Sequence, residues 1–279
     1  MSAVARGCGS IFIPDSQHNS NSSGGVQQQA TAQQAQETQE AKKGGDLVRL
    51  LSSTSSCVLQ PHAFFVSWQG VVTLAYRGFP PALVRLKQQL DAKHPGLPKE
   101  NPGSKWPKTS LGCVRDKCRL APQQLDTLLR ICREESEILR EDRLASQGFL
   151  VDRAAVAVFE CRSLERLVSW QEVAFSGEVD MAEPEAEETE RVDRIMAEAE
   201  APDYWFAASR DGNREGHYRG DHLGVTLAFG LPLEEGNVEA ATQIGALIGR
   251  FRQRVDAELP GMYAWFGDSS LHVTLRGVI

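Results

Sequence analysis

The hydrophobic and polar positions of this chain change period several times, and each change indicates an element. The segment from Leu271 to Val278 alternates and is rich in β-branched residues, which is typical of a strand. A similar strand is expected at Val71–Arg77. Phe149–Phe159 and Leu167–Phe175 are two further expected strands and candidates for antiparallel neighbours. Their apolar positions predict three core residues, namely Val156, Val158 and Trp170.

Three other segments show helical spacing of apolar residues. A helix is expected to begin at Pro80 and Pro81, because proline suits the first helical turn. The segment from Pro122 to Arg143 predicts a long amphipathic helix whose charged residues from Arg130 onward form a solvated face. A third helix precedes Asp256 and ends in arginines that suit the helix dipole. The apolar stripes of these helices are, in order, Leu83, Leu86 and Leu90; Leu125, Leu128, Leu129, Cys132 and Leu139; and Ile244, Leu247, Ile248, Phe251 and Val255.

Two segments lack such periodicity. Residues 1–60 are rich in Ser, Gln, Gly and Ala, so they are expected to be disordered, because they bury too little apolar surface to offset the entropy of ordering. Residues 178–200 hold ten acids and two arginines, which indicates a linker or a loose exposed helix. The expected organisation is therefore a disordered segment at 1–60, a first lobe at 61–177, an acidic linker at 178–202 and a second lobe at 203–279.

The order of elements occurs twice in the sequence. The strand Val72–Tyr76 reads V-T-L-A-Y, and Val225–Phe229 reads V-T-L-A-F. Each strand is followed by a helical run, a D-A-x-x-P-G turn that begins at Asp91 or Asp256, a tryptophan, and a short strand. That last strand begins K-T-S-L in the first copy and H-V-T-L in the second. Three matches in the same order at similar spacing predict a duplicated unit.

The last strand of each copy carries the candidate chemistry. Side chains two apart share one face of a strand, so His272 lies beside Thr274, and Lys108 beside Ser110. An imidazole next to a hydroxyl on a rigid strand can bind a phosphate oxygen and move a proton. The simpler alternative for the second copy is a histidine on an edge strand that faces water.

A duplicated β-α-β unit in which each half ends in an H-x-[T/S] strand resembles the 2H phosphoesterase superfamily, which includes RNA ligase-like proteins and 2′,3′-cyclic phosphodiesterases. The segment from Trp265 to Arg276 is the most similar, and a weaker resemblance runs from about Phe64 to the end. The resemblance implies an α+β fold of two lobes with antiparallel-rich sheets around a cleft. The chain departs from the pattern at Lys108, which replaces the first histidine. It also ends five residues after Thr274, so a minimal second lobe or a fragment is expected.

The resemblance implies hydrolysis of a cyclic phosphate or an RNA phosphodiester. In this chain His272 and Lys108 would be the catalytic pair, with His272 as the base and Lys108 as an electrostatic clamp or acid. Thr274, Ser110 and Arg276 would bind the substrate. Two alternatives from other classes stay open: a non-catalytic relative that binds a phosphate, a nucleotide or an RNA end, and an interaction protein. The expected partner is a phosphate-containing small molecule or an RNA end, and the sequence leaves the oligomeric state open.

Composition narrows this picture only slightly. The apolar fraction of 41% suits a globular core, and a net charge of −7 argues against a basic nucleic-acid coat protein. The six cysteines do not have the spacing of a zinc site, and His217, Asp221 and His222 lack a helical metal-binding pattern, so no metal and no cofactor are expected. No apolar run is long enough to span a membrane. A cytoplasmic location is expected, and an arginine without acids in the first 14 residues leaves an organelle transit peptide open.

Overall fold

The computed structural model describes residues 45–210, 212–233 and 239–278. It is an α+β protein whose strands form three mostly antiparallel sheets. Most of the segment expected to be disordered, residues 1–44, lies outside the described residues. Among the described helices, none is long and apolar enough to cross a membrane.

The first sheet has four antiparallel strands, and both copies of the sequence repeat contribute to it. Its order is β10 (Tyr263–Trp265), β4 (Lys108–Val114), β3 (Val72–Tyr76) and β2 (Pro61–Val66). The edge strand β10 comes from the second copy and pairs with Gly112, Cys113 and Val114 of β4. A side chain at position 112 would collide with the Trp265 ring, since a Cβ atom there would lie 2.6 Å from it. Glycine therefore permits this close pairing.

The second sheet is also antiparallel, with the order β11 (His272–Gly277), β9 (Gly224–Gly230), β6 (Arg153–Phe159) and β7 (Leu167–Ala174). The expected antiparallel pairing of the segments around residues 156 and 170 is thus confirmed. Val156, Val158 and Trp170 are only half-buried, which corrects their prediction as core residues. Trp170 lies on β7, the edge of the sheet, whereas Val156 and Val158 of β6 alternate with the buried Ala157 and Phe159 and so point to the less covered face of the sheet.

The third sheet corrects the expected boundaries of the folded part. Its order is β5 (Phe149–Val151), β1 (Ser55–Leu59) and β8 (Gly177–Asp180), and β1 runs parallel to β8. Residues 47–52 are helical, and Leu50, Leu51, Cys57 and Leu59 are buried, so the boundary predicted at residue 60 is wrong. The prediction failed because residues 1–60 are polar on average, while their few apolar residues are concentrated near the end of that segment.

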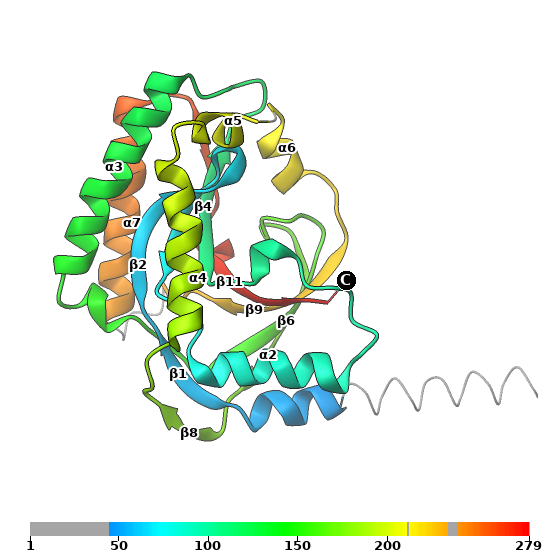
Figure 1. Cartoon of the computed structure of the whole chain (residues 1–279). Helices are drawn as coiled ribbons and strands as arrows, with labels where there is room; N and C mark the ends of the chain where they lie inside the picture. Colours follow the sequence, from blue (N-terminus) through cyan, green and yellow to red (C-terminus); the bar gives the residue numbers. More distant parts are fainter. Residues whose placement is uncertain (1–44, 211, 234–238, 279) are drawn as a thin grey trace, which may run out of the picture. The chain divides into compact units, whose positions relative to one another are not determined.

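The helices are α2 (Pro81–Lys93), α3 (Pro122–Glu141), α4 (Ala186–Ala197), α5 (Tyr204–Ala208), α6 (Arg214–Arg219) and α7 (Glu239–Glu258). The helix α3 packs on β2 and on α7, and α3 and α7 lie side by side in Figure 1. Short 3-10 turns are η1 (Trp68–Gly70), η2 (Pro102–Ser104), η3 (Ala145–Gln147), η4 (Glu198–Glu200) and η5 (Asp268–Ser270). The turns η2 and η5 precede β4 and β11, the two strands that carry the candidate chemistry.

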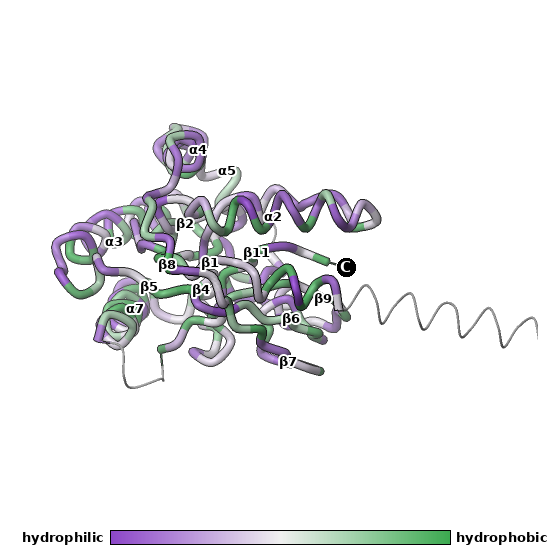
Figure 2. Tube along the Cα trace, turned by 90° about the horizontal axis from the view of Figure 1, so that it is seen from below, coloured by the Kyte–Doolittle hydropathy of each residue, from purple (hydrophilic) through white to green (hydrophobic). Residues whose placement is uncertain are grey.

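The predicted acidic linker is part of the fold. It contains β8, which pairs with β1, and α4, which is largely hydrophilic in Figure 2. Val192 of α4 is nevertheless fully buried in the main core, and Glu188 is also buried. This segment is therefore a packed helix and strand rather than a linker, and one buried valine per helix is too weak a periodic signal to reveal that.

One hydrophobic core joins elements from both copies of the repeat. The Phe64 ring of β2 stacks on the Phe251 ring of α7, with centroids 4.3 Å apart. Phe149 lies between Tyr76 and Phe229, which occupy equivalent positions of the two repeated strands, at 6.3 and 6.5 Å. The predicted apolar stripes of the three helices are largely buried. The predicted solvated face of α3 requires one correction, because Glu135 is completely buried.

Candidate functional site

The strands β4 and β11 belong to different sheets and contact each other, as Figure 1 shows. Lys108 and Ser110 of β4, and His272 and Thr274 of β11, are half-buried and alternate with buried residues. Alternation puts Lys108 and Ser110 on one face of β4, and His272 and Thr274 on one face of β11. We call these four residues the motif site.

Lys108 is a shielded cation without an acidic partner among the described residues. Its ammonium group donates a hydrogen bond to the Gly103 carbonyl of η2 and lies 4.4 Å from the centre of the Trp106 ring. Burial, with a smaller contribution from the positive charge of Lys87, lowers the pKa of Lys108 from 10.5 to about 8. An amine with that pKa is mostly protonated at pH 7 and can donate its proton more readily than an ordinary lysine.

His272 is held in one orientation by the turn that precedes its strand. Its Nδ1 atom is 2.7 Å from the Ser270 carbonyl oxygen. A carbonyl only accepts, so Nδ1 carries the proton and the neutral ring has its lone pair on Nε2. Burial lowers the pKa of His272, the Ser270 carbonyl acts in the opposite direction, and the charge of Lys108 lowers it further. The two motif strands therefore bring Lys108 and His272 within electrostatic reach of each other.

Ser110 contacts a residue that sequence reasoning missed. The Tyr218 hydroxyl of α6 interacts with the side chains of Ser110 and Arg214. Burial raises the pKa of Tyr218, while nearby Arg214 and the Ser110 hydroxyl act to lower it. Because α6 packs on β4, a helix outside the repeated elements contributes to the surroundings of the motif site.

A cation from each repeated helix holds the motif strand of the other copy. Lys87 of α2 donates to the Leu275 carbonyl of β11 at 2.9 Å and also pairs with Glu100. Arg252 of α7 donates to the Leu111 carbonyl of β4 at 3.4 Å and also pairs with Asp268. Leu275 and Leu111 each follow the hydroxyl residue of their motif.

Sequence reasoning could have found this second pair of residues. Lys87 lies four residues before Asp91, and Arg252 lies four residues before Asp256, so both precede the D-A-x-x-P-G turn by the same distance. Alignment of the two copies places them at the same position. No comparable signal in the sequence marks Tyr218 or Arg214, because α6 has no counterpart in the first copy.

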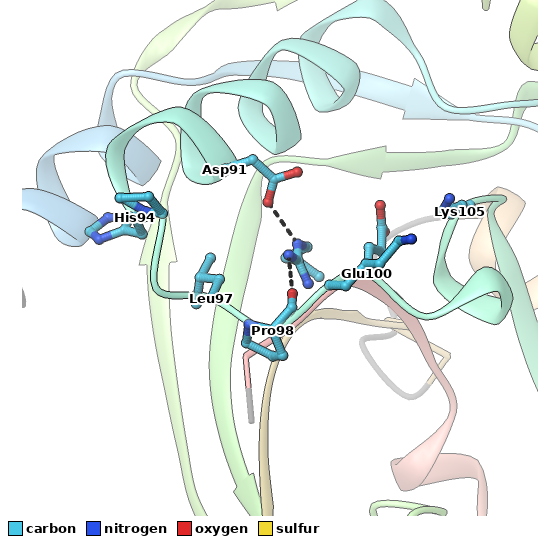
Figure 3. A pocket seen from close by; sticks show the side chains of 9 residues that line it. Asp91, His94, Leu97, Pro98, Glu100 and Lys105 are labelled. Carbon is cyan, nitrogen blue, oxygen red and sulfur yellow. Dashed lines mark hydrogen bonds and ion pairs between the residues drawn. The ribbon is translucent and has the colours of Figure 1, made fainter.

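Arg276 does not belong to the motif site, which corrects its prediction as a substrate-binding residue. Its side chain is 4% exposed, and its guanidinium group donates to Asp91 at 3.0 Å and to the Pro98 and Gly277 carbonyls. Figure 3 shows the bonds to Asp91 and Pro98 in a pocket along the loop after α2. The ladder of β11 also shifts register between Thr274 and Arg276, so Arg276 does not continue the alternation of His272 and Thr274.

Among the residues that the structure describes, no group of three or more His, Cys, Asp or Glu side chains is arranged to hold a metal ion. Comparisons of this chain with models of protein families, with curated proteins and with solved structures found no match. The function is therefore inferred from the residues of the site.

Proposed function

We propose that the chain is a divergent 2H-type phosphoesterase built from two β-α-β units around a shared phosphate site. Support for duplication comes from the order of elements, since β3–α2–η2–β4 in the first copy corresponds to β9–α7–β10–η5–β11 in the second, where β10 is an additional strand. In both copies the first strand pairs antiparallel with the motif strand. The helix cations Lys87 and Arg252 supply independent support, because they occupy equivalent positions and bond to equivalent carbonyls.

The two units differ in the register of their strands. Ala75 is opposite Lys108 in the first unit, whereas Ala228, the equivalent of Ala75, is opposite Thr274 in the second. The second motif strand is therefore displaced by two residues. A shift of two keeps every side chain on its face of the sheet, so both units still present their motif residues together.

In the proposed reaction a water molecule attacks the phosphorus of a cyclic phosphate. His272 accepts the water proton on Nε2, which has no hydrogen-bond partner among the described residues and is the free position of the neutral ring. Lys108 donates its proton to the departing ribose oxygen and balances the charge of the phosphate. Ser110 and Thr274 donate hydrogen bonds to the non-bridging oxygens, where negative charge increases in the transition state.

The observation that carries this proposal is the placement of Lys108, whose ammonium group lies over the Trp106 ring with no carboxylate partner among the described residues and near the oriented ring of His272. A shielded cation without an acidic partner is unfavourable unless an anion binds there. Near neutral pH, Lys108 can then donate a proton and the neutral ring of His272 can accept one. A non-catalytic phosphate-binding relative is the second candidate, because a protonated Lys108 can also hold a phosphate without donating its proton.

Hydrolysis of nucleoside 2′,3′-cyclic phosphates tests the proposal. The wild-type protein should bind these ligands and convert them to monophosphates, and His272→Ala should lower the turnover by at least about a hundredfold. Lys108→His should raise the turnover, because it restores two histidines. His222→Ala is a control outside the motif strands. Binding without turnover would select the phosphate-binding relative, and an absence of binding would exclude both candidates.

A further inference from the structure

The helix α6 brings additional chemistry next to the motif site. The Tyr218 ring packs against Phe266, with centroids 5.0 Å apart, and the Tyr218 hydroxyl interacts with both Ser110 and Arg214. The central carbon of the Arg214 guanidinium is 5.3 Å from the centre of the Tyr218 ring. Arg214 and Ser110 therefore both lie near the Tyr218 side chain.

Arg214 differs from the other arginine of the same helix. Arg219 pairs with Glu165 and Glu215 and donates to the Trp265 carbonyl, so its donors are used within the protein. Arg214 forms no ion pair among the described residues, although Glu215 is its neighbour in sequence. Its Nε atom is shielded from solvent and has no hydrogen-bond partner there. A shielded, unpaired donor on a charged group is costly, and an anionic ligand would remove that cost.

We infer that Arg214, supported by Tyr218, forms a second anion subsite that binds a second phosphate group of the ligand. This inference rests on the proposed function, because the first phosphate is the one held by the motif site. A guanidinium group suits the role, since its parallel N–H donors match two phosphate oxygens. The expected ligand is therefore a nucleotide that carries a cyclic phosphate at one end and a second phosphate at the opposite end.

Two ligands that differ by one phosphate test the subsite by titration calorimetry on the full chain. These are adenosine 2′,3′-cyclic phosphate and the same compound with a 5′-phosphate. The wild-type protein should bind the second ligand about tenfold more tightly. Arg214→Met should remove this preference and leave the affinity for the first ligand nearly unchanged. Arg133→Met is the matched control, because it removes the same charge from an exposed position of α3 and should keep the preference.

Three results are distinguishable. Equal affinity of the wild-type protein for the two ligands would overturn the inference, and that comparison requires no variant to fold. An equal loss of affinity for both ligands in Arg214→Met would also overturn it, because Arg214 would then serve the first phosphate. If the wild-type protein bound neither ligand, the proposed function itself would fail. Arg214→Gln is a second variant, which also removes the positive charge and should disturb the packing around Tyr218 less than Arg214→Met does.

Discussion

Two contacts of the second copy of the repeat, one with α3 and one with the first copy, have opposite patterns of charge. Between α3 and α7, three arginines and three glutamates form one connected network, namely Arg130, Glu134, Glu135, Arg250, Arg254 and Glu258. At the motif site Lys108 has no acidic partner among the described residues, and neither does Arg214 on the adjacent helix α6. Between α3 and α7 each charged side chain faces one of opposite sign. Lys108 and Arg214, in contrast, keep a positive charge that can bind an anion.

This difference separates a structural contact from a binding site. A buried charge whose partners are all present holds two helices in one arrangement, and removal of one partner leaves the others uncompensated. A shielded charge without a partner destabilises the empty protein and favours a ligand of opposite charge. The same residue types therefore serve different purposes at the two places, and substitutions at each should change stability in opposite directions.

The largest expected effect is at the balanced interface. Glu135 is fully buried between Arg250 and Arg254, at 3.1 and 3.0 Å. Glu135→Gln removes the charge that both arginines face, so the free energy of unfolding should fall by about 3 kcal/mol in urea denaturation. Glu137→Gln, at an exposed position of the same helix, should change it by less than about 0.5 kcal/mol. Equal effects of the two substitutions would contradict the structural role of the network.

The next effect concerns the two helix cations that hold the motif strands. Lys87→Met and Arg252→Met should each lower the free energy of unfolding by about 2 kcal/mol, because each leaves a strand carbonyl and a carboxylate without a charged donor. Both should also weaken phosphate binding, since both displace a motif strand. Lys93→Met removes an exposed charge from α2 and serves as the control. A loss confined to one of the two variants would show that Lys87 and Arg252 are not equivalent.

A smaller effect of opposite sign is expected at Lys108. Its pKa is about 8 in the folded protein and 10.5 ordinarily, so the unfolded chain binds more protons between these values. Stability should therefore rise as the pH increases from about 8 toward 10.5. At pH 7 Lys108→Met should stabilise the empty protein by about 1–2 kcal/mol, because it removes the shielded charge.

Thermal unfolding across this pH range measures the effect, and a phosphate titration at pH 7 measures the accompanying loss of affinity. The stability difference between Lys108→Met and the wild-type protein should shrink as the pH rises. If Lys108→Met destabilised the protein equally at every pH, Lys108 would have a structural role and the contrast with Glu135 would disappear.

The smallest effect is the electrostatic contact within the motif site. The charge of Lys108 lowers the pKa of His272, so this pKa should rise in Lys108→Met. Titration of the histidine ring signals by NMR measures the change, and the signal of His62, which lies near Asp193, should not move between the two proteins. An unchanged His272 signal would show that the two motif residues do not share a site.

Local patterns predicted much of the fold. The period of 3.6 residues located α3 and α7 and most of their buried residues, and alternation located β3, β9, β11 and the β6–β7 pair. The same alternation predicted that His272 and Thr274 share a face, and the repeat predicted Lys108 and Ser110 as their counterparts. Glu135 and Arg276 were assigned incorrectly because a charged residue gives the same local signal in water and in a buried ion pair.

The sequence by itself determined the α+β class, the positions of most helices and strands and the alternation of residues along β11, because these follow from periodicity and composition over short distances. Tertiary structure alone decided that β10 crosses to the first sheet, that Lys87 and Arg252 hold opposite strands, and that α6 brings Arg214 close to Ser110. The physical reason is that burial and charge compensation depend on neighbours far apart in the chain. The pKa of Lys108 shows this directly, since burial among distant elements and the charge of Lys87 make it unlike an ordinary lysine.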